Sequence, residues 1–348
     1  MVNYPDFDSL PPVEGQPQGN AWGFWGKGDE LGTLNLLTPE VIRNASQEIK
    51  IGKSVQLDLR LDHFDHGIAG RERFEQTIVD FQERNKGGEY EIVAHDDVVR
   101  FNTQSSSQWD GLRHVGLQSS GVYYGGMKHR EIDEGGTGKL GIQSEYTDPP
   151  VRPFQTNQPG NIADWVENGG IVGRGILLDY HRWREDTGKE PAKIDSPFPM
   201  TVDELDEVAR YQNLELKTGD ILIIRSGFTA WHDSTPSAER AKSLDRGEFI
   251  GVEASMKSVK WLWNHHFAAV AGDSLGFEVC PAPFGNKDKV CLHEWLLTHW
   301  GCPIGELWNL EKLSKACAEA KQWSFFFTSA PLHVFGGVGT TPNAIAIL

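Results

Sequence analysis

Four polar side chains of chemically useful types are concentrated in one short stretch of the sequence. Gln104, Gln108, Asp110 and His114 are spaced four, two and four residues apart. A carboxylate can bind a metal cation, and an imidazole that titrates near neutral pH can transfer a proton. The glutamine amide oxygens are neutral ligands of the kind that oxygen-preferring cations accept. Because Trp109 lies between them, we predict that these groups emerge from an apolar wall, as in a small-molecule pocket.

Length and composition restrict the class of protein. The chain has 348 residues, of which 39% are hydrophobic and 24% charged, and its net charge is −16. This balance is typical of a globular protein with a core, and the negative charge argues against nucleic acid or an anionic membrane as a partner. There is no long apolar run and no basic and apolar N-terminal leader, so we expect a cytoplasmic protein. Four cysteines without a Cys-x-x-Cys pair are expected to be free thiols.

Helix-capping signals and apolar runs predict alternating helices and strands. A Thr-Pro pair at residues 38–39 and a Thr-x-x-Glu capping box at Thr201 mark two helix starts. Further helices are predicted over residues 292–300 and 311–322, and strands over residues 54–61, 90–101, 173–179, 219–227 and 267–273. The alternation indicates an α/β or α+β protein with a substantial sheet. We expect one domain over residues 1–348, with an irregular N-terminal arm of about 25 residues.

The motif at residues 104–114 also carries a resemblance to a known family. It aligns without gaps on the pattern His-x-Gly-Thr-His-x-Asp-x-Pro-x-His, with glutamine at two of the three histidine positions and leucine in place of proline. Other matching stretches are residues 25–35, 173–179, 219–227, 293–310 and 331–339. Together they resemble the cyclase family of metal-dependent hydrolases, which includes bacterial kynurenine formamidase and isatin hydrolase. The resemblance implies a swivelling β/β/α-type fold, in which helices pack against a central, partly barrel-like sheet.

The resemblance also implies roles for individual residues. Asp110, His293 and Glu306 match metal ligands, and His114 matches the catalytic histidine. Gln108 falls at a further ligand position. Because an amide oxygen is a weaker zinc ligand than an imidazole, the set favours a single Mn²⁺ ion, with Zn²⁺ or Mg²⁺ as alternatives.

Each of these candidates also has a structural interpretation. Asp110 precedes a glycine and could form a turn, His114 could be a structural histidine, and Glu306 could be a charge at a helix start. The spacing between the two late ligands is one residue longer than expected. Glu294 and His299 therefore remain alternatives to His293.

Five residues are candidates for substrate binding: Gln104, Trp109, Trp22, Trp25 and Tyr124. The two early tryptophans could instead pack in the core or at an oligomer interface, because aromatic residues dominate both. Either glutamine of the motif could simply hydrogen-bond its loop. His63 and His66 are expected on a surface loop, with a role in a pocket as the alternative.

The resemblance implies hydrolysis of a C–N or C–O acyl bond, as in an amide, a cyclic amide or a lactone of a small, aromatic or apolar molecule. Metal-activated water would attack the acyl group while His114 acts as general acid and base. A metal-dependent cyclase or dehydratase, and a non-catalytic small-molecule-binding relative, are the alternatives. No Gly-x-Ser-x-Gly motif is present, which argues against a serine hydrolase. A homodimer or larger homo-oligomer is also expected.

Overall fold

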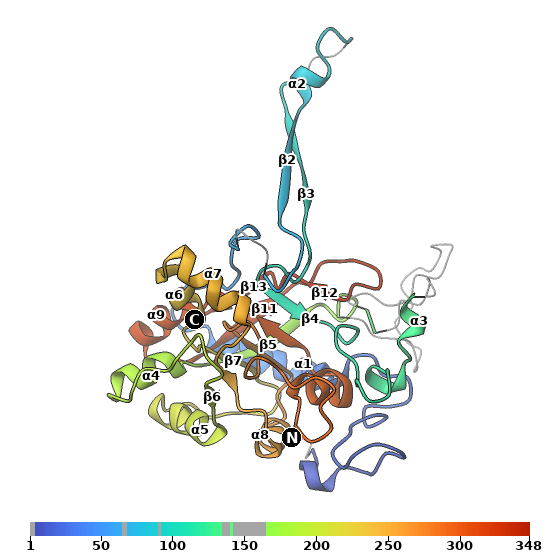
Figure 1. The fold of residues 1–348 in the computed structure, drawn as a ribbon, viewed down its shortest axis with the longest axis vertical. Helices are drawn as coiled ribbons and strands as arrows, with labels where there is room; N and C mark the ends of the chain where they lie inside the picture. Colours follow the sequence, from blue (N-terminus) through green and yellow to red (C-terminus); the bar gives the residue numbers. More distant parts are fainter. Residues whose placement is uncertain (1–3, 65–67, 90–91, 134–139, 142–164) are drawn as a thin grey trace.

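A curled central sheet, packed by helices, forms the body of the protein (Figure 1). The computed structural model describes residues 4–64, 68–89, 92–133, 140–141 and 165–348. Within this part of the chain the sheet has nine strands. In spatial order they are β1 (Ser54–Gln56), β13 (Ala344–Ile347), β11 (Ser324–Ser329), β5 (Ile171–Leu178), β7 (Ile221–Ile224), β9 (Ala269–Gly272), β10 (Ile304–Glu306), β4 (Gln108–Asp110) and β12 (Gly339–Thr340). The predicted mixed class and partly barrel-like sheet are confirmed.

Helices and two small sheets surround this body. The α-helices are α1 (Pro39–Ala45), α2 (Phe81–Arg84), α3 (Arg130–Asp133), α4 (Tyr180–Asp186), α5 (Val202–Tyr211), α6 (Phe228–Ser234), α7 (Ser237–Arg246), α8 (Met256–Asn264) and α9 (Glu311–Ala320). The 3₁₀-helices are η1 (Phe7–Ser9), η2 (Gly32–Leu36), η3 (Ser46–Glu48) and η4 (Tyr124–Gly126), and η5 (Glu294–Trp300) is a π-helix. The small sheets pair β2 (Glu75–Asp80) with β3 (His95–Arg100), and β6 (Pro199–Met200) with β8 (Gly251–Val252). None of the described helices is long and apolar enough to cross a membrane.

The predicted buried strands form the parallel centre of the sheet. β5, β7, β9 and β10 are parallel neighbours, and the side chains of β7 and β9 are fully buried. Both faces of such strands are covered, which explains their continuous apolar sequences. The polar residues at their C-terminal ends bond to one another: Arg225 donates to Asp179 at 2.9 Å, and the Ser226 hydroxyl donates to Asp273 at 2.7 Å. These hydrogen bonds link the C-terminal ends of β5, β7 and β9.

Local signals predicted most element starts, and tertiary pairing decided their lengths. The Thr38 side chain caps α1, and Thr201 with Glu204 forms the predicted capping box of α5. The strand expected over residues 54–61 pairs only as β1, although alternate residues stay buried as far as Leu59. The strand expected over residues 90–101 is observed as β3, and residues 90–91 lie outside the described part of the chain. The helix expected over residues 292–300 is the π-helix η5.

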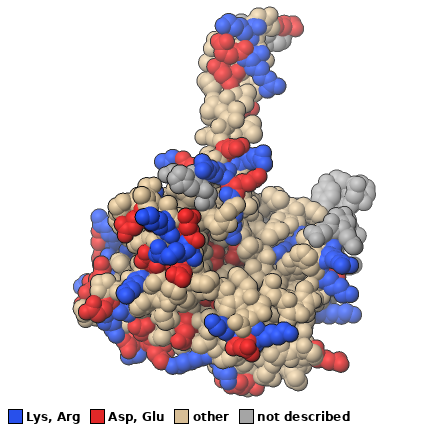
Figure 2. Space-filling view, in the orientation of Figure 1, with Lys and Arg blue, Asp and Glu red and all other residues tan. Residues whose placement is uncertain are grey.

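The β2–β3 hairpin projects from the body without packing against it (Figure 1). All six residues of β3 are exposed, including Val98 at 60%, and Ile78 on β2 is 59% exposed. Charged side chains of both signs gather at its tip and at its base, and the stretch between them is mostly uncharged (Figure 2). An isolated two-stranded hairpin is marginally stable in water, so this element lacks the packing that normally stabilises a sheet.

Candidate metal centre

Two short strands at one end of the sheet bring the predicted motif to the late glutamate. β4 and β10 are antiparallel, with Gln108 opposite Glu306 and Asp110 opposite Ile304. Because side chains alternate along a strand, Gln108 and Asp110 share one face and Trp109 points to the other. The register therefore joins the two halves of the site, which are far apart in sequence.

Three potential metal ligands converge on this face. The ligand atoms of Asp110, His293 and Glu306 all lie within 4.8 Å of one another, and all three side chains are buried. His293 Nε2 is 3.1 Å from Glu306 Oε1 and 3.8 Å from Asp110 Oδ2. A cation could therefore contact one atom of each residue.

The polar atoms left unpaired in this cluster fit a bound cation. Gln108 Oε1 and Asp110 Oδ2 are buried without a hydrogen-bond partner. Buried acceptors without partners are costly, and a cation between them would satisfy both. Gln108 Nε2 donates to Glu306 Oε2 at 2.8 Å, which keeps the amide oxygen available. The donor set thus contains two carboxylates, one imidazole and one amide oxygen, and it fits the predicted divalent metal.

The second glutamine of the motif, Gln104, makes different hydrogen bonds from Gln108. Its Nε2 donates to Asp110 Oδ1 at 2.9 Å, and its Oε1 accepts from Arg71 at 3.0 Å. Both ends of the amide are occupied, so Gln104 positions the Asp110 carboxylate and its oxygen is not free for a ligand. Because Gln104 occupies one oxygen of Asp110, the other oxygen is the one that is left without a hydrogen-bond partner.

Glu278 is a functional candidate that the sequence motifs did not indicate. It is fully buried and accepts from His293 Nδ1 at 2.7 Å and from the His293 backbone nitrogen at 2.9 Å. A carboxylate on the far nitrogen of a ligating histidine holds the ring and increases its basicity. No motif or residue spacing in the sequence distinguishes Glu278 from the other glutamates of the chain.

Charge and burial shift the titration of the cluster. Burial, with the nearby Glu306 carboxylate, raises the pKa of Asp110 well above its usual value. Although burial opposes it, the hydrogen bonds that His293 donates to Glu278 and Glu306 raise the pKa of His293 well above its usual value. Burial also opposes the shift at Glu306, but the bond from His293 lowers the pKa of that carboxyl. The carboxylates around His293 thus favour a positive charge in the cluster, which a bound cation would supply.

His114 stands between the cluster and an open cavity. Its Nε2 is 3.8 Å from Asp110 Oδ1, and its side chain is 23% exposed. With Tyr123 and Phe284 it lines a cavity of about 540 Å³, a size typical of small-molecule sites. The Phe284 ring also meets the His293 ring edge-on at 5.5 Å. A small molecule in this cavity would contact His114 next to the ligand cluster.

The structure brings only some of the predicted residues to this centre. Trp109 is fully buried, packs against Trp308 and donates to Ser329, so it is a core residue and not a pocket residue. The alternative ligands are also placed elsewhere. Glu294 accepts from the Gln118 backbone, and His299 bonds Asn20.

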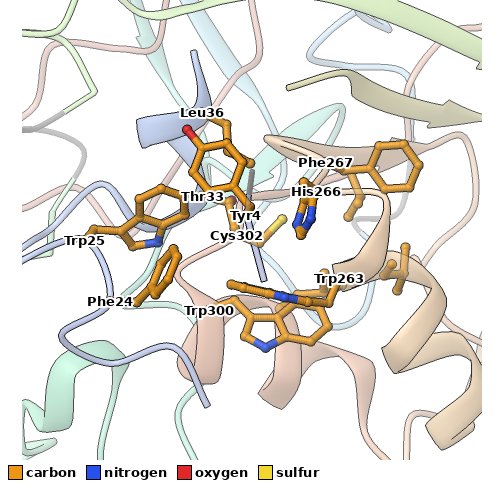
Figure 3. A pocket seen from close by; sticks show the side chains of 13 residues that line it. Tyr4, Phe24, Trp25, Thr33, Leu36, Trp263, His266, Phe267, Trp300 and Cys302 are labelled. Carbon is orange, nitrogen blue, oxygen red and sulfur yellow. The ribbon is translucent and has the colours of Figure 1, made fainter. Parts of the chain in front are cut away.

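The remaining substrate-binding candidates lie in the region of the N-terminal arm. Trp22 donates to the Thr298 carbonyl at 2.6 Å, and Tyr124 donates to Asp29 at 2.8 Å. Both line a second cavity, which does not include the ligand cluster. Trp25 lines a narrow aromatic cavity with Tyr4 and Phe24 (Figure 3). The structure therefore assigns Trp25 to the packing of the arm against the body, the alternative left open by the sequence.

The fold and the buried ligand cluster define a mixed α/β protein with a candidate metal centre at one end of a curled sheet. Over residues 36–279 the sequence matches a family described as "Putative cyclase". This match spans more than half of the chain, so the protein belongs to the cyclase family, and the predicted resemblance is confirmed.

Solved structures of similar fold agree with this assignment. A crystal structure described as a novel cyclase is 28% identical with a TM-score of 0.77, over 94% of this chain and 99% of that chain. Isatin hydrolase A from Labrenzia aggregata, bound to benzyl benzoate, is 14% identical with a TM-score of 0.53, over 90% and 98%. An isatin hydrolase bound to the product analogue thioisatinate is also 14% identical, with a TM-score of 0.52, over 90% and 97%. No curated protein matches the sequence.

Proposed function

We propose that the protein is a metal-dependent hydrolase that opens a C–N or C–O acyl bond of a small molecule. The observation that carries this proposal is the buried cluster of Asp110, His293 and Glu306, together with the buried oxygens of Asp110 and Gln108 that have no hydrogen-bond partner. Membership of the cyclase family supports an enzyme of the hydrolase or cyclase class. The oxygen-rich donor set favours Mn²⁺ over Zn²⁺.

A divalent cation held here would supply Lewis-acid activation of water and of the acyl oxygen. The protein's own residues supply the rest. Glu278 fixes the ring of His293, and Gln104 fixes the Asp110 carboxylate. His114 accepts the proton of the attacking water and returns it to the leaving nitrogen or oxygen. Burial lowers the pKa of His114 to about 4, so its imidazole is neutral and able to accept a proton at physiological pH.

The cavity beside His114 supports an apolar or aromatic substrate. Its walls include Tyr123, Phe284, Val115 and Leu117. Aromatic and aliphatic walls with few polar groups are typical of sites that bind small apolar molecules. Benzyl benzoate and thioisatinate, the ligands named for the isatin hydrolases of similar fold, are both aromatic.

The test is a panel of esters, lactones, formamides and cyclic amides, assayed with the protein stripped of metal and then reloaded with Mn²⁺, Zn²⁺ or Mg²⁺. The expected result is turnover that disappears with chelator, returns with Mn²⁺ and is lost in His114→Ala although the metal is retained. Stoichiometric metal without turnover of any compound would instead indicate a binding protein. Turnover unaffected by chelator would overturn the proposal.

We also propose that the protein assembles with further copies of itself through the β2–β3 hairpin. The register of the two strands places two exposed apolar residues, Ile78 and Val99, on one face of the hairpin, where such an assembly would cover them. The mixture of acidic and basic residues on the hairpin suits pairing with an identical surface, because each sign can meet the other.

A further inference from the structure

A second group of potential metal ligands lies outside the centre described above. It consists of His63, in the loop between β1 and the β2–β3 hairpin, and His232 and Asp233, which are adjacent in α6. None of the three belongs to the first cluster. His232 is buried, His63 is partly buried, and the Asp233 side chain is 55% exposed.

The three side chains face a common point. Asp233 Oδ1 is 3.1 Å from His63 Nε2 and 3.1 Å from His232 Nδ1. The three ligand atoms all lie within 4.8 Å of one another. In a tetrahedral zinc site with bonds of about 2.0–2.1 Å, neighbouring ligand atoms are roughly 3.3 Å apart. The two separations from Asp233 are therefore close to those that a tetrahedral ion requires.

The His63 ring nitrogen is the observation that points to a ligand. His63 Nε2 is buried and makes no hydrogen bond, although an Asp233 oxygen is only 3.1 Å away. The approach is thus close enough for a hydrogen bond but wrongly angled for one. The His63 and His232 rings lie 4.9 Å apart and are tilted by 38°. A cation between the rings and the carboxylate would pair the nitrogen that the protein leaves without a partner.

We propose that His63, His232 and Asp233 form a second divalent-cation site that takes Zn²⁺. Two imidazole nitrogens, which are borderline donors, and one carboxylate oxygen form a set that suits zinc, in contrast to the oxygen-rich first cluster. The exposed side of Asp233 leaves a fourth position for water. Because His63 precedes the hairpin and the other two ligands belong to α6, the ion fastens the segment at the base of the hairpin to the body.

The side chains around His232 and Asp233 suit the binding of an ion. The Phe64 ring meets the His232 ring edge-on at 4.8 Å, and Phe228 stacks on its other side at 6.2 Å. Arg240 donates to the His232 backbone carbonyl at 3.0 Å. This bond goes to the backbone and not to the Asp233 carboxylate. Aromatic packing holds one ligand ring in place while the carboxylate stays accessible to an incoming ion.

The test uses the full chain with the first cluster disabled by Asp110→Asn and Glu306→Gln, so that it does not depend on the proposed activity. After removal of metal, calorimetry with ZnCl₂ is expected to show one equivalent of bound Zn²⁺. Loading with CoCl₂ is expected to give the absorption of tetrahedral cobalt. Adding the substitution His63→Gln to this protein with the disabled first cluster should weaken zinc binding by about 10–100-fold or more.

Two further variants keep the outcome decisive. Asp233→Asn changes an exposed side chain, so its fold is expected to survive, and it should weaken Zn²⁺ binding in the same way. His181→Gln removes a surface histidine paired with Glu185 at 3.4 Å, and it should leave binding unchanged. The proposal is overturned if the protein with the disabled first cluster binds no Zn²⁺, or if His63→Gln and Asp233→Asn bind it as tightly as their parent.

Discussion

Gln108 and Glu306 lie opposite each other across the β4–β10 pair, and the Gln108 amide nitrogen donates to the Glu306 carboxylate at 2.8 Å. The amide oxygen of Gln108 is buried and has no hydrogen-bond partner. The glutamine at a family histidine position thus serves two purposes: it holds one ligand and offers another.

Two substitutions of Gln108 should have different effects, one on metal affinity and the other on metal preference. Gln108→Leu removes both the donor to Glu306 and the free oxygen, and we expect metal binding to weaken by roughly 10–100-fold. Gln108→His should shift preference from Mn²⁺ toward Zn²⁺, because imidazole is the better zinc ligand. Competitive titration with both ions measures the two effects. Gln104→Leu is the comparison, since its oxygen already binds Arg71, and a larger loss there would contradict the assignment.

Glu278→Gln should weaken metal binding without changing the ligands themselves. The carboxylate accepts from His293 Nδ1 at 2.7 Å, and neutralising it lowers the basicity of the ring. We expect a loss of roughly 10–100-fold in affinity, measured by isothermal titration. Glu294→Gln alters a nearby glutamate outside the cluster and should have little effect. Equal losses in the two variants would argue against a specific role for Glu278.

The pH dependence of turnover should reflect the lowered pKa of the buried His114. Burial lowers its pKa to about 4, so a general base at this position is already neutral at pH 6. With saturating metal, kcat/KM is expected to be flat from pH 6 to 8 and to fall only below about pH 5. His114→Gln should reduce kcat by roughly 10²–10⁴-fold and remove this acid limb. An acid limb near pH 6.5 that depends on His114 would contradict the low pKa.

Buried His299 should make folding stability depend on pH. Burial lowers its pKa to about 4, whereas an unfolded histidine titrates near about 6.5. Between these values the unfolded chain binds a proton that the folded chain does not, so stability falls as pH drops from about 6.5 to 4. The full effect is about 3 kcal/mol. Urea unfolding at pH 7 and pH 4.5 measures the difference in the free energy of unfolding. The variant His299→Gln should reduce this difference. The control variant His95→Gln, on the exposed hairpin, should leave it unchanged.

The β2–β3 hairpin should control the oligomeric state. Light scattering of the wild-type chain is expected to give a mass of at least two copies. The double variant Ile78→Asp, Val99→Asp places charges on the face where apolar residues would be covered, and its mass should fall toward one copy. Ile51→Asp changes a 56% exposed residue on the body and is the matched control. A monomeric wild-type protein, or an unchanged mass in the double variant, would refute assembly through the hairpin.

Local sequence determined much of the framework. Short apolar runs bounded by glycines indicate buried strands, and Thr38 and Thr201 cap helices through contacts within one turn. The spacing of Gln108 and Asp110 also placed both on one face of a strand once residues 108–110 paired as β4. These features depend on neighbours in the chain, so a linear pattern contains them.

Tertiary structure alone decided which groups meet. The register of β4 on β10 joined Gln108 to Glu306, and the same alternation sent Trp109 into the core instead of the pocket. Glu278 reaches His293, and His63 reaches Asp233, only because the chain folds back between them. Such contacts depend on the positions of backbone segments that are distant in sequence, and no spacing of residue types encodes those positions.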